Sequence, residues 1–120
     1  MVRLAITEIY METRPKDDIA CHKVIQLASD MENDSPIHAV LLLYKAKALR
    51  GLNMPTAAAE VLSKIIRKTR DRSDELLRAI RYERALAYQD SGENSRYRAD
   101  LEKLYAEYPD YEDVAKRLGV

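Results

Sequence analysis

Residues 58–65 read AAEVLSKI, and the apolar triplet Ala58, Leu62 and Ile65 sets the phase of this stretch. The same triplet pattern occurs 38 positions earlier in residues 20–27, ACHKVIQL, and 39 positions later in residues 97–104, YRADLEKL. Steps of four and three residues place each triplet on one face of a helix. A fixed period of this size predicts a repeat architecture, in which each unit stacks on its neighbours to bury its apolar face, and it favours a binding function.

Length, charge and cysteine usage bound the class of protein. The 120 residues suffice for one domain without disulfides, and Cys21 is the only cysteine. The 20 Lys and Arg residues equal the 20 Asp and Glu residues, so net charge alone cannot attract nucleic acid or an anionic membrane. No apolar run has the length of a membrane span, and Glu8 and Glu12 interrupt the N-terminal stretch. We expect a soluble, cytoplasmic protein.

Proline and glycine divide the chain into segments with helical periodicity, and no segment alternates as a strand would. The expected helices span about residues 2–13, 15–32, 36–50, 55–70, 74–91, 95–108 and 110–118. Pro36 and Pro55 suit helix starts, Ser35 and Ser73 can cap the helices that follow them, and Gly51 suits a helix end. Short connections make successive helices antiparallel. The sequence therefore predicts an all-α chain of helix hairpins.

A small-then-large pair recurs in the last two expected hairpins. Ala46 and Leu49 are matched 39 residues later by Ala85 and Tyr88. With this pattern, residues 37–111 resemble two consecutive tetratricopeptide repeats (TPRs), and a divergent repeat precedes them. The first unit departs from the family because it lacks the small residue in its first helix.

The resemblance implies a right-handed α-solenoid of three antiparallel helix hairpins with a capping helix, about seven helices in one domain over residues 1–120. Its parts would be a divergent repeat at 1–35, repeats at 36–73 and 74–109, and a capping helix at 110–120. We expect Asp110, Glu112 and Asp113 in the first turn of that last helix, where carboxylates complement the helix dipole.

In the TPR family, the first helices of the hairpins line a concave groove that holds a peptide or partner helix. When this sequence is aligned with the repeat register of the family, the resemblance assigns the following residues to the groove: Val40, Leu43, Tyr44, Lys47, Arg50, Tyr82, Glu83, Leu86, Gln89 and Asp90. Members that clamp a C-terminal carboxylate use Lys, Asn and Arg, whereas Tyr44, Ala79 and Glu83 occupy the matching places here, so we expect no such clamp. Tyr44 and Tyr82 fit a groove anchor and a core position equally well. The resemblance implies a non-catalytic protein-interaction module.

The first expected helix has apolar residues on two sides. Val2 and Ile6 can pack on the second helix, but Leu4 and Met11 lie nearly opposite and need another cover. Two alternatives follow. Either the chain forms a homodimer through Leu4 and Met11, or it is part of a longer protein whose upstream domain covers them.

Residues 64–84 carry an excess of positive charge, and Arg78, Arg81 and Arg84 form a stripe at three-residue steps. One interpretation is contact with phosphate or an acidic partner. The alternative, which we favour, is a solvated face with interspersed acids. The charge balance reverses at residues 90–113, and neighbouring units can pair these acids with the basic residues. A nucleic-acid partner is therefore not expected.

Site chemistry for an enzyme is missing from the sequence. Zinc needs three or four ligands, whereas Cys21 and His22 stand with only one further histidine, His38. We interpret Cys21 as a buried thiol and His22 as a surface imidazole. No glycine-rich phosphate loop or convergent catalytic set is present in the sequence. We expect no metal, no cofactor and no catalytic residue.

Overall fold

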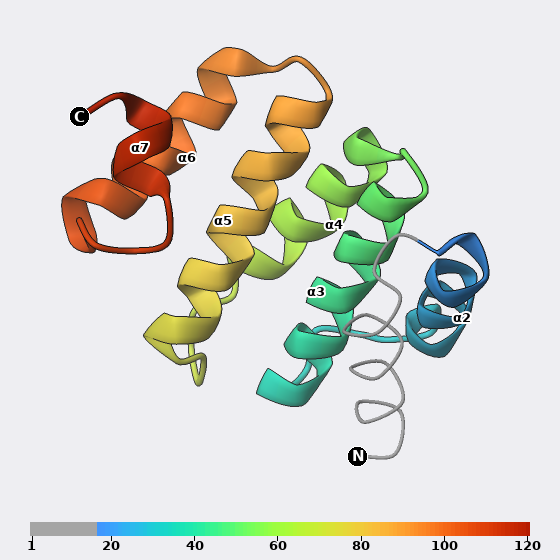
Figure 1. Ribbon diagram of the computed structural model, residues 1–120. Coiled ribbons are helices and arrows are strands. Elements are labelled where there is room, and N and C mark those ends of the chain that lie inside the picture. Colours follow the sequence, from blue (N-terminus) through green and yellow to red (C-terminus); the bar gives the residue numbers. More distant parts are fainter. Residues whose placement is uncertain (1–16) are drawn as a thin grey trace.

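The computed structural model describes residues 17–120, and helices joined by turns make up this part of the chain (Figure 1). The helices are α2 (Asp18–Ala28), α3 (Pro36–Gly51), α4 (Pro55–Ile66), α5 (Asp74–Asp90), α6 (Asn94–Glu107) and α7 (Val114–Leu118). Residues 17–120 contain no strand, which confirms the all-α prediction for this part. The expected helix at 2–13 lies outside the described residues.

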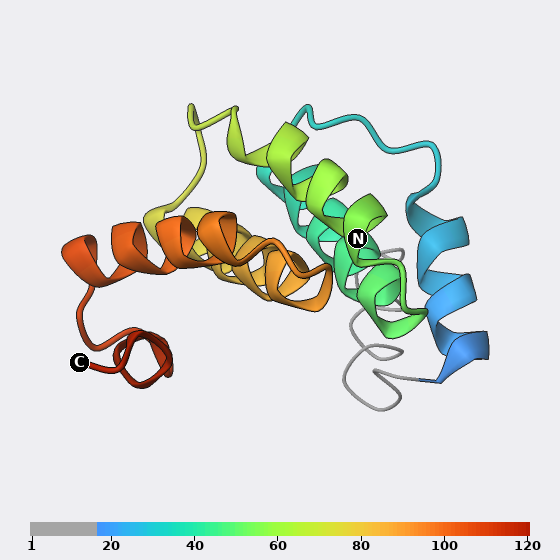
Figure 2. The same ribbon diagram turned by 90° about the horizontal axis from the view of Figure 1, so that it is seen from above.

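Each of these helices packs against the next one along the chain, as expected for hairpins. The hairpins α3–α4 and α5–α6 lie side by side, with α2 at one end and α7 at the other (Figures 1 and 2). Helices α3 and α5 also contact each other, whereas the backbones of α4 and α6 stay apart. Helix α5 therefore has neighbours on several sides, and its polar contacts define the surfaces described below.

Local signals fix most helix ends. The Ser35 hydroxyl accepts a hydrogen bond from the His38 N–H at 3.2 Å, and Ser73 caps α5 in the same way, as predicted. Gly51 is the last residue of α3, so the helix ends where the sequence predicted, but the left-handed residue is Asn53, with φ of 62°, and not Gly51. The Met54 N–H donates a hydrogen bond back to the Leu49 carbonyl at 2.8 Å. This hydrogen bond ends the helix, and its geometry needs a left-handed residue just past the last helical turn.

Three helices are shorter than the sequence predicted. Helix α2 covers 18–28 instead of 15–32, and α4 ends at Ile66 instead of residue 70. Helix α7 begins at Val114, so the acids expected in its first turn precede it. Turns occupy the residues before α7, where Glu112 has a positive φ of 43° and Tyr111 N–H donates to the Tyr108 carbonyl. A left-handed residue interrupts a regular helix, which explains the late start.

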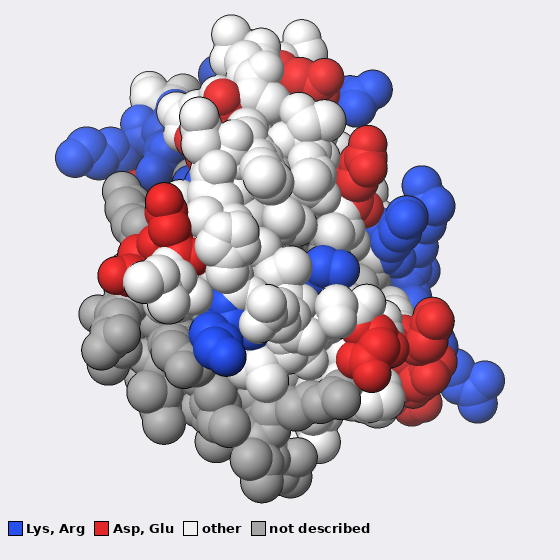
Figure 3. Space-filling model, turned by 90° about the vertical axis from the view of Figure 1, so that its right-hand side faces the viewer, with Lys and Arg blue, Asp and Glu red and all other residues white. Residues whose placement is uncertain are grey.

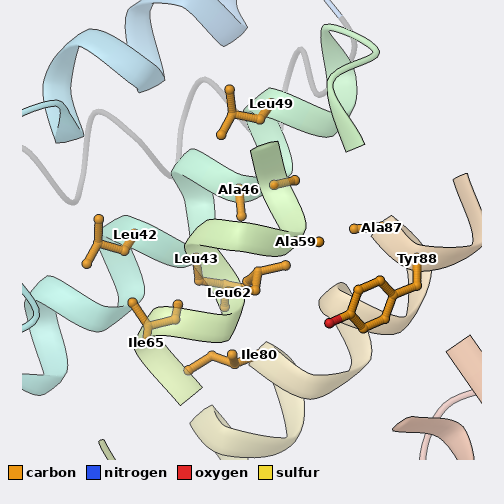
Figure 4. Close-up of a cluster of buried hydrophobic side chains, with 11 residues drawn as sticks. Leu42, Leu43, Ala46, Leu49, Ala59, Leu62, Ile65, Ile80, Ala87 and Tyr88 are labelled. Carbon is orange, nitrogen blue, oxygen red and sulfur yellow. The ribbon is translucent and has the colours of Figure 1, made fainter. Parts of the chain in front are cut away.

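The repeated triplet faces the core. Ala58, Leu62 and Ile65 are at most 2% exposed and lie in the main buried cluster between α3, α4 and α5, together with Leu42 and Ile80 (Figure 4). The other two triplets contribute to two smaller clusters. Val24 packs with Cys21 and Ala48 between α2 and α3, and Leu101 and Leu104 pack with Ala85 and Val114 between α5, α6 and α7. The periodicity thus identified the buried face of three helices.

Candidate partner-binding surface

A cluster of charged side chains joins α3 to α5. The Arg50 guanidinium lies 2.6 Å from a Glu83 carboxylate oxygen and 3.0 Å from an oxygen of Asp90. Burial alone would lower the pKa of Arg50, but the two carboxylates outweigh it and raise that pKa. Three of the residues assigned to the groove by register are therefore together, but they bind one another. We call Arg50, Glu83 and Asp90 the α3–α5 ion cluster; its formal charge is −1 at pH 7.

Three apolar residues assigned to the groove, Leu86, Val40 and Leu43, lie on the same two helices as this cluster. Leu86 follows Glu83 by one turn and is half-buried, yet it belongs to none of the three buried clusters of the described chain. Val40 on α3 is also half-buried and also belongs to none of these three clusters. Leu43, in contrast, is only 6% exposed and packs in the main cluster. Leu43 is thus a core residue, so its assignment to the groove is wrong.

The two tyrosines of the expected groove lie at opposite ends of the surface. Tyr44 packs against the buried cluster of Cys21, Val24 and Ala48, and the Lys47 ammonium lies 5.3 Å from its ring centre. It therefore has a packing role between α2 and α3. A residual part of its surface remains exposed.

Tyr82 and Gln89 contact the chain's own last helix. The Tyr82 ring meets Tyr111 edge to face, with the ring centres 5.7 Å apart, and its hydroxyl donates to Asp113. Burial, with a smaller effect from Asp113, raises the pKa of Tyr82 to about 12. The Gln89 side-chain oxygen accepts a hydrogen bond from Arg117 at 3.1 Å. Residues near α7 thus cover this end of α5, and Leu86 is the apolar side chain that remains beside the α3–α5 ion cluster.

A second ion cluster joins α5 to α6 and contains most of the predicted arginine stripe. Arg84 makes two hydrogen bonds to Asp100, at 2.8 and 2.9 Å, and Arg81 reaches the same carboxylate at 3.2 Å. Asp100 is 4% exposed. We call Arg81, Arg84 and Asp100 the α5–α6 ion cluster; its formal charge is +1 at pH 7. Arg78 is separate, since its guanidinium stacks 3.8 Å from the Tyr108 ring centre.

The pairing of the arginine stripe with the acidic stretch at residues 90–113 is confirmed for Arg81 and Arg84. Sequence reasoning did not single out Asp100 as the buried partner, and it missed a contact between two loops. Asp100 lies three residues after Tyr97 and four before Leu104, so an acid on the apolar face of the helix was the available signal. In the loops, Arg72 is 9% exposed and donates to the Asn33 side-chain oxygen at 3.0 Å and to its carbonyl at 3.2 Å. Lys68 donates to the same carbonyl at 2.9 Å. No sequence pattern signals this pairing.

The face that carries α2 has few charges at its centre (Figure 3). Lys, Arg, Asp and Glu side chains gather toward its margins, and Ile19 on α2 is 71% exposed. The residues proposed for self-association, Leu4 and Met11, lie outside the described residues.

Within residues 17–120, no three His, Cys, Asp or Glu side chains come close enough to hold a metal ion. Cys21 is fully buried, and burial followed by the charges of Asp18 and Asp17 raises its pKa, which keeps the thiol protonated. None of the helices α2 to α7 is long and apolar enough to cross a bilayer.

No family model matches the chain, and neither the curated proteins nor the solved structures include a significant match.

Proposed function

We propose that the chain is a TPR-like, right-handed solenoid that acts as a non-catalytic protein-interaction module. The partner is a peptide or an amphipathic helix that lies across α3 and α5. Adjacent hairpins, contact between α3 and α5, and the separation of α4 from α6 support this arrangement. The single buried cysteine and balanced charge suit a cytoplasmic location.

The observation that carries the proposal is Leu86 beside a charged cluster whose members already bind one another. A half-buried leucine outside the described core clusters gains stability when a partner covers it, at about 25 cal/mol per Å² of apolar area. The charged side chains beside Leu86 already pair with one another, namely Arg50 with Glu83 and Asp90. A partner that covers them therefore does not bury a charge without an opposite charge next to it. Their residual charge of −1 favours a partner whose apolar face is bordered by basic residues.

A display library of amphipathic helical peptides, selected against the full chain, tests this function. Peptides with apolar anchors and basic flanks should be enriched, and Leu86→Glu should weaken their binding at least tenfold because it places a charge in the apolar contact. Tyr105→Glu is the control, since Tyr105 is an exposed apolar residue of α6 outside this surface. Thermal unfolding checks that both variants fold.

Two outcomes contradict the proposal. Selected peptides could bind both variants equally, or selection could yield no specific peptide. Light scattering of the full chain separates peptide binding from homodimer formation, because a stable dimer without peptide affinity supports the assembly alternative.

A further inference from the structure

A cleft lies between α4 and α6, whose backbones do not contact each other. It is on a different side of α5 from Leu86 and the α3–α5 ion cluster. Its volume is about 280 Å³, and side chains of α4, the end of α5 and the start of α6 line it. Tyr88 forms part of its floor and is 8% exposed. The Ser63 hydroxyl lies at the floor too, 3.5 Å from the Tyr88 hydroxyl, and accepts a hydrogen bond from Arg84 at 3.3 Å.

Positive charge lines both walls of this cleft. Lys64 in the last turn of α4 and Arg67 just after it are exposed, and their side chains have no ion pair or hydrogen bond within residues 17–120. Arg96 stands on the α6 wall, and its 3.4 Å pair with Glu93 joins two exposed side chains and is correspondingly weak. Glu60 is the other carboxylate of the lining. Three cations thus face two carboxylates.

The α5–α6 ion cluster adds to this excess. Its charge of +1 is next to the cleft, because Arg84 reaches Ser63 at the floor. Arg84 and Arg96 also approach the Tyr88 ring, with guanidinium carbons 5.6 and 5.8 Å from its centre. The cleft therefore joins several cationic donors and a hydroxyl in a partly enclosed space.

We propose that this cleft binds a phosphate monoester group through Lys64, Arg67 and Arg96, with the Ser63 hydroxyl at its floor. A dianion with three acceptor oxygens matches several cationic donors from two helices, whereas a carboxylate needs only one arginine. The surface further along α5 also carries three cations against two carboxylates, but Arg81 pairs with Asp100 and Arg78 stacks on Tyr108. These two cations are already engaged, so they do not extend the site into the track that a polyanion needs. The phosphate belongs either to a free small ester or to a phosphorylated side chain of a partner.

Titration of the ¹⁵N-labelled full chain with inorganic phosphate, against sodium chloride at matched ionic strength, tests the site. Saturable amide shifts should cluster at residues 60–67 and 91–96. The double variant Lys64→Gln with Arg67→Gln should raise the dissociation constant at least tenfold. The matched control is Lys23→Gln with Lys116→Gln, which removes the same charge from exposed positions on α2 and α7 and should leave binding unchanged.

A phosphoserine peptide and its unphosphorylated twin then identify the source. Tighter binding of the phosphopeptide than of inorganic phosphate assigns the group to a partner side chain, and equal binding assigns it to a small ester. Shifts that do not saturate, that lie elsewhere, or that weaken equally in both double variants would overturn the site. Leu86→Glu should leave phosphate binding intact, so failure of the peptide surface and failure of this cleft give different results.

Discussion

Helix α5 meets α3 and α6 through two ion clusters of opposite composition. On the α3 side, one arginine forms ion pairs with two carboxylates, and on the α6 side, two arginines form ion pairs with one carboxylate. A chain with no net charge therefore has a residual negative charge on one side of α5 and a residual positive charge on the other. Net charge says nothing about this local polarity, which determines the partners each side can accept.

The two clusters also differ in burial. Each cluster has one buried carboxylate, since the side chain of Asp100 is 6% exposed and that of Glu83 is 7% exposed. The α3–α5 cluster differs because it also contains Asp90, whose side chain is 41% exposed. Hydrogen bonding to Asp100 raises the pKa of Arg84 despite burial. Removing one member of an ion pair lowers the free energy of unfolding more when the remaining charge is buried and cannot be solvated by water. The α5–α6 cluster should therefore be the more sensitive of the two.

Asp100→Ala should have the largest effect. Two largely buried arginines then lose their carboxylate, and the free energy of unfolding should fall by about 3 kcal/mol. Urea denaturation measures the change. Glu102→Ala on the same helix is the control, because Glu102 forms only an exposed pair with Arg98 and should cost at most about 0.5 kcal/mol. Equal losses for both variants would contradict the buried role of Asp100.

Glu83→Ala should have a smaller effect on the α3–α5 side. Arg50 keeps Asp90 as a partner, so we expect a loss of about 2 kcal/mol in the free energy of unfolding. Asp90→Ala should cost about 0.5 kcal/mol, since this carboxylate is largely solvated and Glu83 remains. The reverse order, measured by the same urea denaturation, would mean that Asp90 and not Glu83 holds Arg50.

The contact of α5 with the α7 region should give the smallest effect, visible only at high pH. The folded pKa of Tyr82 is about 12, above the ordinary value of 10, so the protonated phenol favours folding. This stability is fully present below pH 10 and is lost as pH rises from 10 to 12. The midpoint of urea unfolding should fall more steeply in that range for the parent chain than for Tyr82→Phe. Matching pH profiles would show that Tyr82 does not contribute; Tyr105→Phe serves as the exposed control.

Helix positions and buried faces could be predicted from the sequence because they depend on near neighbours. The spacing of Ala58, Leu62 and Ile65 identified a buried face, and Ser35 and Ser73 act within three residues. The late start of α7 could not be predicted, because the turn before it depends on backbone geometry at Glu112.

The candidate surface was harder to predict, because its charged residues act on partners far along the chain. Arg50 binds Glu83 across 33 positions, and Arg84 binds Asp100 across 16. Register could place Arg50 and Glu83 on one side of the fold, but it could not reveal that they neutralise each other. Charge counting likewise found the arginine stripe and the acidic stretch at residues 90–113, but it could not identify Asp100 as the buried partner.

The loop contact between Arg72 and Asn33 bears on modularity. Arg72 lies in the connection between α4 and α5, and its partner Asn33 lies in the connection between α2 and α3. Each connection is thus completed by a residue outside its own hairpin. The hairpins of this chain therefore cannot be exchanged one at a time with those of another protein. A recombination boundary at Pro36 would separate Asn33 from Arg72. A transplanted hairpin would need both connections from the same parent protein.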